Sequence, residues 1–265
     1  MITLTFKTNH NKRKGKDMKT SLNILLLTFM VGSISIALAR KGQPADKSLE
    51  KGWTDTFILS EQTFLSTGTN PYFILQPGYN LVLEGKEGDN EVRLVVSVLE
   101  ETEVVDGVKT RVVEERESKN GEVVEISRNF YAIDRTTNSV FYFGEDVDIY
   151  RNGKIVGHEG GWRSGENDAR YGLMMPGLAL IGSRFYQEFA KDVALDRAEI
   201  ISTTDSIAVP AGQFSNCVKF EETTPLEPGV KEYKYYAPGV GLIRDGDLVL
   251  VKYGFIKPPK SAIKK

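Results

Sequence analysis

The residues of this sequence that are most capable of chemistry form an acidic run, Gly144-Glu145-Asp146-Val147-Asp148, followed by an Asn152-Gly153 pair. Asn-Gly is a preferred dipeptide of two-residue hairpin loops, and such a loop fixes which residues face one another. In that register Asp146 faces Glu159 and Asp148 faces Gly157, so three carboxylates share one face of the hairpin. Like charges at directly opposite positions destabilise a sheet.

A bound hard cation would reverse that cost, because Ca²⁺ accepts carboxylate oxygens in flexible geometry. The sequence therefore offers Asp146, Asp148 and Glu159 as a candidate Ca²⁺ site, although their spacing is unlike that of an EF-hand loop. The simpler interpretation, which we prefer, is a solvated acidic hairpin end with Lys154 or Arg163 as counter-charge. No other cofactor is expected.

Two acids in one site could also serve a hydrolase acting on envelope glycans, since glycoside cleavage uses two positioned carboxyl groups. Other catalytic arrangements lack residues. In the predicted register His158 faces Val147, away from the acids, and no Gly-x-Ser-x-Gly occurs. Cys217 stands beside Val218 in a strand-like run and is expected in the core. The sequence contains no phosphate loop and no dinucleotide fingerprint, so no catalytic residue is assigned.

Aromatic residues supply a second candidate site, because they fall on most of the predicted strands. Adjacent rings, as in Phe141-Tyr142-Phe143, must point to both faces of a sheet. One face should fill the core, and the other could line a groove for an apolar or sugar ligand; the alternative is that all the rings serve packing. The segment Leu173-Met174-Met175 could plug or cover one end. The candidate ligand-binding residues are Tyr142, Tyr150, Met174, Met175, Tyr186 and Tyr235.

The elements that must position these residues follow an N-terminal segment of different character. Five Lys and Arg residues between 12 and 19 precede an apolar run, Leu22–Leu38, that ends in Ala37-Leu38-Ala39. A basic start, a short apolar stretch and small residues two apart predict a secretory signal peptide over 1–39. An uncleaved membrane anchor is the alternative, and Met18 is an alternative start. The protein is therefore expected to be exported, to the periplasm or beyond the cell, with no transmembrane segment after cleavage.

Charge and cysteine content exclude several classes of protein. Cleavage after Ala39 would leave 226 residues, with 28 Lys and Arg against 35 Asp and Glu, a net charge of −7. Such a chain has no basic field for nucleic acid. It has one cysteine, so it cannot form an intrachain disulfide. Stability must come from the packed core.

The rest of the chain predicts a meander of strands. Asx-Gly pairs at 106–107, 120–121, 152–153 and 245–246 each separate two β-rich runs, which indicates antiparallel hairpins. Residues 40–69 are expected to form a loosely ordered lead-in, 70–256 an antiparallel β domain, and 257–265 a basic tail. The predicted registers place Arg116 opposite Glu125, Val113 opposite Arg128, Thr102 opposite Arg111 and Glu101 opposite Val112.

Only the stretch from Gly165 to Gly182 breaks the β pattern, and we expect a short helix or a loop there, crossing one end of the sheet. Sequential hairpins with little helix predict a mainly β fold: a single antiparallel meander curled into a barrel or an open half-barrel. A flat sheet of about ten strands is not expected, because strand twist accumulates.

Three segments carry a resemblance: Asn70-Pro71-Tyr72-Phe73 with Pro77-Gly78, then Val209-Pro210-Ala211-Gly212-Gln213-Phe214, then Tyr235–Ile243 with its Tyr-Ala-Pro-Gly-Val-Gly-Leu core. The chain resembles a broad group of uncharacterised exported bacterial β-rich proteins, and is loosely similar in expected fold to periplasmic lipoprotein carriers. That resemblance implies a curved sheet that could cup an acyl chain. It carries over no functional residue.

The leading interpretation is a non-enzymatic exported β-protein that binds an apolar, lipid-like ligand or a cell-envelope partner on the concave face of its sheet. The carboxylate-based hydrolase and a Ca²⁺-stabilised structural domain remain the alternatives.

Overall fold

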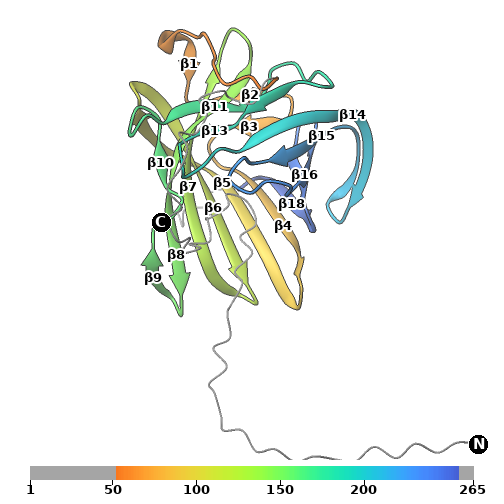
Figure 1. Ribbon diagram of the computed structural model, residues 1–265. Helices are drawn as coiled ribbons and strands as arrows, with labels where there is room; N and C mark the ends of the chain where they lie inside the picture. The colour runs from red at the N-terminus through yellow and green to blue at the C-terminus, as the bar shows by residue number, and fades with distance from the viewer. Residues whose placement is uncertain (1–51, 257–265) are drawn as a thin grey trace, which may run out of the picture.

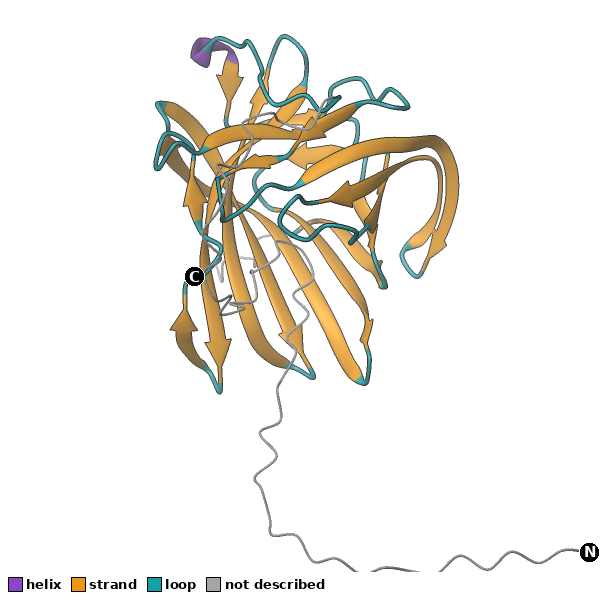
Figure 2. Cartoon of the chain, viewed as in Figure 1, coloured by secondary structure: helices purple, strands orange, loops and turns teal. Residues whose placement is uncertain are grey.

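The computed structural model describes residues 52–256, and nearly all of them belong to β-strands or the turns between them (Figure 2). The described residues contain a single helical turn, the 3-10 helix η1 (Glu61–Thr63). The predicted mainly β, antiparallel class is confirmed. The predicted signal peptide over 1–39 and the basic tail lie outside the described residues. No helix within 52–256 has the length and apolar character needed to cross a membrane.

One large sheet and one separate two-stranded sheet make up the fold. The N-terminal strands are β1 (Phe64–Leu65), β2 (Gly68–Asn70) and β3 (Phe73–Leu75). The long strands of the first half are β4 (Tyr79–Glu87), β5 (Asn90–Val105), β6 (Val108–Lys119), β7 (Glu122–Asp134) and β8 (Ser139–Arg151). Short strands follow: β9 (Lys154–Gly157), β10 (Trp162–Arg163), β11 (Arg170–Met175), β12 (Arg184–Tyr186) and β13 (Glu188–Phe189). The chain ends with β14 (Arg197–Val209), β15 (Gly212–Thr223), β16 (Glu232–Ala237), β17 (Gly241–Asp245) and β18 (Leu248–Phe255).

The large sheet curls into a nearly closed barrel with one seam (Figure 1). Its strand order is β12-β14-β15-β16-β17-β18-β4-β5-β6-β7-β8-β11-β13. The two terminal strands, β12 and β13, are separated in the chain by the single residue Gln187. The backbone amides of Gln187 and Glu188 both donate to the Asp196 carbonyl, at 2.8 and 3.2 Å. The chain itself therefore bridges the seam.

The hairpin loops follow the local chemistry of Asx-Gly. At 106–107, 120–121 and 152–153 both residues have positive φ, between 50° and 84°, as a type I′ loop requires. The fourth pair differs from the prediction. Asp245 is the last residue of β17, pairs with Leu248, and points inward, while the loop consists of Gly246 and Asp247 with positive φ at Gly246. Asp245 is therefore an interior carboxylate.

Bulges overturn most of the predicted side-chain pairs. On β7 an extra residue, Val124, shifts the register, so Arg116 faces Ile126 and Val113 faces Asn129. The predicted pairs of Arg116 with Glu125 and of Val113 with Arg128 are wrong for this reason. Next to the 106–107 loop, Thr102 does face Arg111 as predicted.

Arg111 explains the next irregularity, a register shift between β5 and β6. Beyond Thr102 the β5–β6 register shifts before Val98 pairs with Val113, which leaves no place for the predicted pair of Glu101 with Val112. The buried guanidinium of Arg111 donates to the Glu100 carbonyl at 2.6 Å and to the Ser66 carbonyl at 2.8 Å. The bulged carbonyls thus satisfy a buried cation that would otherwise lack acceptors.

Two apolar clusters lie on the two faces of the sheet. The larger one fills the barrel interior and includes Leu83, Val113 and Ile243. The smaller one lies on the outer face of β6, β7 and β8, where Phe57 and Phe64 pack over it. Residues 53–69 were predicted as part of a loose lead-in, but β1 pairs with β7 and β2 pairs with β3. The ordered domain therefore begins before Asn70, because these residues cover an apolar outer face.

Part of the stretch predicted as helix or loop is a strand. Within 165–182, β11 pairs with β8 and with β13 and continues the sheet. Irregular chain remains on both sides of β11. In this strand Tyr171 packs against the smaller cluster, Met174 belongs to the larger one, and Leu173 contacts both, so the strand contributes side chains to both faces of the sheet.

Candidate functional site

A hairpin closes one end of the barrel. The β2–β3 hairpin contacts β7 on one wall and β17 on the other, although β18, β4, β5 and β6 separate these two strands in the sheet. Its tip is tied down by Asn70, whose amide donates to the carbonyls of Asn138 at 2.8 Å and Pro176 at 2.9 Å. The Asn70 side-chain oxygen accepts the Tyr72 amide at 2.8 Å, an Asx turn. The hairpin therefore lies across the lumen as a fixed plug.

Two of the segments that carry the sequence resemblance meet at this plug. The turn between β16 and β17 places Gly239 under the hairpin, where its amide donates to the Pro71 carbonyl at 2.7 Å. The Tyr79 hydroxyl donates to the Val240 carbonyl at 2.8 Å. Gly241 has φ 106°, and a Cβ added to it would lie 3.7 Å from the Tyr72 carbonyl oxygen. Both segments therefore have a common structural purpose, which is to seat the plug.

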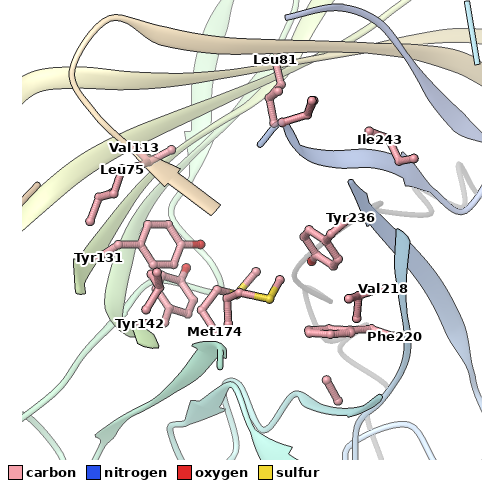
Figure 3. Packing of buried hydrophobic residues seen from close by; sticks show 14 of the residues in the cluster. Leu75, Leu81, Val113, Tyr131, Tyr142, Met174, Val218, Phe220, Tyr236 and Ile243 are labelled. Atoms are coloured by element: carbon pink, nitrogen blue, oxygen red, sulfur yellow. The ribbon is translucent and has the colours of Figure 1, made fainter. Parts of the chain in front are cut away.

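Beneath the plug lies a cavity of about 60 Å³. Figure 3 shows three of its lining residues, with Met174 between Tyr131 and Tyr236. A water-sized sphere occupies about 15 Å³, so the cavity has room for about four such spheres. Most of its lining is apolar. The lining residues are Tyr72, Phe73, Ile74, Tyr79, Leu81, Val96, Val98, Val113, Glu115, Tyr131, Met174, Lys234, Tyr236, Val240, Gly241 and Leu242.

The polar part of this lining consists of two charged residues and several tyrosines. Glu115 projects from β6, and Lys234 and Tyr236 project from β16. Lys234 pairs with Glu222 at 2.9 Å and lies 3.8 Å from Asp245. Tyr236 is 2% exposed, and its hydroxyl has no hydrogen-bond partner. An apolar cavity thus ends at a charged floor.

Beyond the floor the barrel interior is rich in acids. Carboxylates from the strands and loops around the lumen face one another, and the lysines Lys119 and Lys234 lie among them. The acids are Glu87, Glu115, Glu117, Glu125, Glu145, Glu188, Asp196, Glu222, Glu232 and Asp245. We refer to this set as the acidic chamber.

Burial sets the protonation of the acidic chamber. It raises the pKa of Glu117, Glu125, Asp196 and Asp245 to about 7, and the pKa of Glu145 and Glu188 well above the ordinary value. Burial acts against the charged form of Lys234, but the carboxylates of Asp245 and Glu222 hold its pKa well above the ordinary value. Burial thus favours the protonated forms of these six carboxyls, while Lys234 keeps its ammonium charge.

Several carboxyl oxygens in the chamber have no hydrogen-bond partner among the described residues. They include one oxygen each of Glu117, Glu125, Glu145 and Glu188. The other oxygen of Glu188 accepts a hydrogen bond from the Trp162 indole at 3.1 Å. Unpaired buried oxygens carry a cost of about 1–3 kcal/mol each. The chamber is therefore poised to accept hydrogen-bond donors.

The structure distributes the six predicted ligand-binding residues among different environments. Met174 lines the cavity. Tyr142 lies one layer away: its ring stacks on Tyr131 at 4.7 Å and its hydroxyl donates to Asn129 at 2.5 Å. Met175 is fully buried in the core. The remaining three lie away from the cavity. Tyr186 packs edge-on against Trp53 and Phe189, Tyr235 lies over Lys219 and Arg244 on the outer face, and Tyr150 pairs with Ile155.

The predicted acidic hairpin face does not form. The extra residue Val156 in β9 pairs Ile149 with Gly157, so the predicted pairs of Asp148 with Gly157 and of Asp146 with Glu159 are wrong. Asp146 instead binds the Arg163 guanidinium at 2.6 Å. Arg163 is therefore the counter-charge of Asp146, one of the two that the simpler interpretation of the sequence predicts.

His158 is also placed differently from the prediction. Its Nδ1 lies 2.9 Å from Asp148 and 2.9 Å from the Val147 carbonyl. Among residues 52–256 no group of three or more His, Cys, Asp or Glu side chains is placed to hold a metal ion. Cys217 is buried in the core, as its neighbours predicted.

Sequence reasoning did not assign Glu115, Lys234, Tyr131 or Tyr236 to the site. One signal was available for Glu115, because it alternates with Val113 and Glu117 along a strand whose Val113 side is apolar. Lys234 and Glu115 come together only through closure of the barrel. Comparisons with known proteins give no further assignment: no family model, no curated protein and no solved structure matches this chain.

Proposed function

We propose that this protein is an exported, non-enzymatic β-barrel that binds an apolar, lipid-like small molecule inside its lumen. The observation that supports the proposal is the cavity beneath the β2–β3 plug, lined by Ile74, Leu81, Val98 and Leu242 on strands from both walls. Binding cavities of proteins are mostly apolar with a few placed polar groups, and this one ends at Glu115, Lys234 and Tyr236.

The volume of the cavity limits the ligand. An engineered apolar cavity of about 150 Å³ holds a benzene ring, whereas this cavity measures about 60 Å³. The cavity can therefore enclose only one end of a chain such as hexan-1-ol, which is larger than benzene, and the rest of that chain would leave beside the plug. The apolar wall would favour it at about 25 cal/mol for each Å² of apolar surface removed from water.

Calorimetric titration with hexan-1-ol tests this function. We expect saturable binding of one molecule to the unmodified chain. Ile74→Trp fills the cavity from the plug and should abolish that binding. Ile58→Trp is the matched control, because Ile58 is 97% exposed and does not line the cavity. Absence of binding to the unmodified chain, or equal binding by the two variants, would overturn the proposal.

A further inference from the structure

The cavity floor contains a hydroxyl that is built to meet a ligand. Tyr236 lines the cavity, is 2% exposed, and its hydroxyl is buried without a hydrogen-bond partner. Tyr131 and Met174, which line the same cavity, lie on one side of this ring in Figure 3. A buried hydroxyl without a hydrogen-bond partner carries a free-energy penalty, and a ligand atom that hydrogen-bonds to it would remove that penalty.

The same floor carries an acid beside an ammonium group that other acids already hold. Glu115 stands on the cavity wall, and the nearby ammonium group of Lys234 is already bound by Glu222 and approached by Asp245. Behind the floor the carboxyls of the acidic chamber outnumber its two lysines. A cation at this position would pair with Glu115 and favour its ionised form, whereas an anion would have to compete with Glu222 and Asp245 for the ammonium group of Lys234.

The cation that fits is organic rather than a metal ion. A metal ion requires several oxygen ligands converging at about 2.3–2.6 Å, and the part of the chain from 52 to 256 has no group of three or more such side chains so placed. An ammonium group needs only hydrogen-bond distances and brings three N–H donors. The apolar walls above the floor accommodate the first carbons of the chain attached to it.

We propose that the ligand is an alkyl amine whose ammonium group binds between the Glu115 carboxylate of β6 and the Tyr236 hydroxyl of β16. This inference rests on the proposed function, because it assigns the polar end of the same lumen ligand. The Glu115 carboxylate accepts one N–H and the Tyr236 oxygen accepts a second. Lys234 stays with Glu222 and excludes the amine from the deeper carboxyls.

Three probes of equal chain length test the headgroup on the unmodified chain: hexylamine, hexan-1-ol and hexanoate, titrated by calorimetry at pH 7.5. Charge-assisted hydrogen bonds are roughly twice as strong as neutral ones. We therefore expect hexylamine to bind about tenfold more tightly than hexan-1-ol, a difference of about 1.4 kcal/mol, and hexanoate to bind more weakly than both.

Variants then locate the headgroup. Glu115→Gln and Tyr236→Phe should bring hexylamine to within about threefold of hexan-1-ol while hexan-1-ol affinity is retained. Glu114→Gln and Tyr235→Phe are the matched controls, since each is a neighbour in the chain on the outer face, where Glu114 lies near Arg116 and Arg128. These controls should keep the full preference, and near-ultraviolet circular dichroism checks that each variant is folded.

The outcomes separate the two proposals. Binding of hexanoate as tightly as hexylamine, or a preference for hexylamine that survives Glu115→Gln, overturns the amine assignment and leaves the apolar cavity function standing. Failure of hexan-1-ol to bind overturns the proposed function, and failure of all three probes overturns the amine assignment with it. The headgroup comparison on the unmodified chain gives its answer even if a variant does not fold.

Discussion

Glu117 of β6 and Glu125 of β7 stand directly opposite each other, and both are buried. The Ser127 hydroxyl donates to Glu125 at 2.8 Å, and Lys119 lies 3.5 Å from Glu117. Two carboxylates at facing positions repel when both are ionised. The native barrel therefore favours their protonated forms.

This pair predicts that the protein loses stability as pH rises. The pKa of each carboxyl increases from 4.5 to about 7 on folding because of burial. The folded state then binds more protons than the unfolded state, so the slope of unfolding free energy against pH is negative. Stability from these groups is full below pH 4.5 and is lost as pH rises through 7. Thermal unfolding from pH 5 to 8.5 measures it, and an unchanged melting temperature over that range contradicts the prediction.

Substitution at Glu125 should weaken the dependence of the melting temperature on pH. Glu125→Gln removes the ionisable group while keeping its shape, so the variant should melt at a higher temperature than the unmodified chain at pH 8.5. Their difference should shrink toward pH 5. Glu91→Gln, at an exposed position of β5, is the control and should leave the profile unchanged. A variant that is equally destabilised at every pH would show that Glu125 acts through packing alone.

Removal of the lysine at the cavity floor should be strongly destabilising. Lys234 is 5% exposed and pairs with Glu222, so Lys234→Met leaves buried carboxylates without their counter-charge. Breaking such a pair costs about 3–5 kcal/mol. The loss should increase above pH 7, where Asp245 ionises.

Urea unfolding at pH 6 and 8.5 checks this, with Lys231→Met as control. Lys231 is exposed and pairs with Glu221 at 2.7 Å on the surface. Such exposed pairs contribute about 0–1 kcal/mol. Equal losses in the two variants would contradict a buried role for Lys234.

The plug hairpin should depend on one side chain. Asn70→Ala removes two donated bonds that hold the hairpin tip to the β7–β8 turn and to the residue after β11, and one accepted bond within the hairpin. Leaving buried partners unsatisfied costs about 1–3 kcal/mol each, so we expect a loss of at least about 2 kcal/mol. Hydrogen exchange should also become faster in 68–75. Gln213→Ala, at an exposed position, is the control, and protection of 68–75 equal to that of the unmodified chain would refute the anchoring role.

A glycine in β8 should tolerate no side chain. Gly144 has φ 128°, and an added Cβ would collide with the Trp162 carbonyl oxygen. The irregularity here allows Tyr142 and Glu145 both to be buried, although they are an odd number of positions apart. Gly144→Ala should cost at least about 2 kcal/mol, since strained backbone costs about 1–3 kcal/mol and the collision adds to it. Gly88→Ala, where an added Cβ meets nothing within 4 Å, is the comparison and should lose much less stability.

Sequence patterns predicted the strands well because their signals are local. Asp106, Asn120 and Asn152 precede glycines, and each adopts the positive φ that ends a strand. The bulge at Val124 has no comparable local signal, and one extra residue moves every later side chain to a new partner. This is why the strand positions were predicted correctly while the facing pairs and the acidic face at Asp146 were not.

The candidate site was harder still to predict from the sequence, because the way its residues come together has no local sequence signal either. Glu115 and Lys234 are separated by four strands of the sheet, β17, β18, β4 and β5, and meet only because the sheet closes. Met174 was predicted because Met is common at adaptable apolar contacts. Tyr186 and Tyr235 have the same composition signal as Tyr236, and only the curvature of the barrel decides which rings point inward.

The seam has one more consequence. A β-sheet ends in two rows of unpaired amides and carbonyls, and such rows can recruit a second molecule. Here the strands at the two ends of the sheet are only three residues (β12) and two residues (β13) long, and Gln187 joins them covalently. Two copies meeting at high concentration would find almost no exposed backbone there on which to polymerise, so this ring should resist growing into a fibre from its own ends.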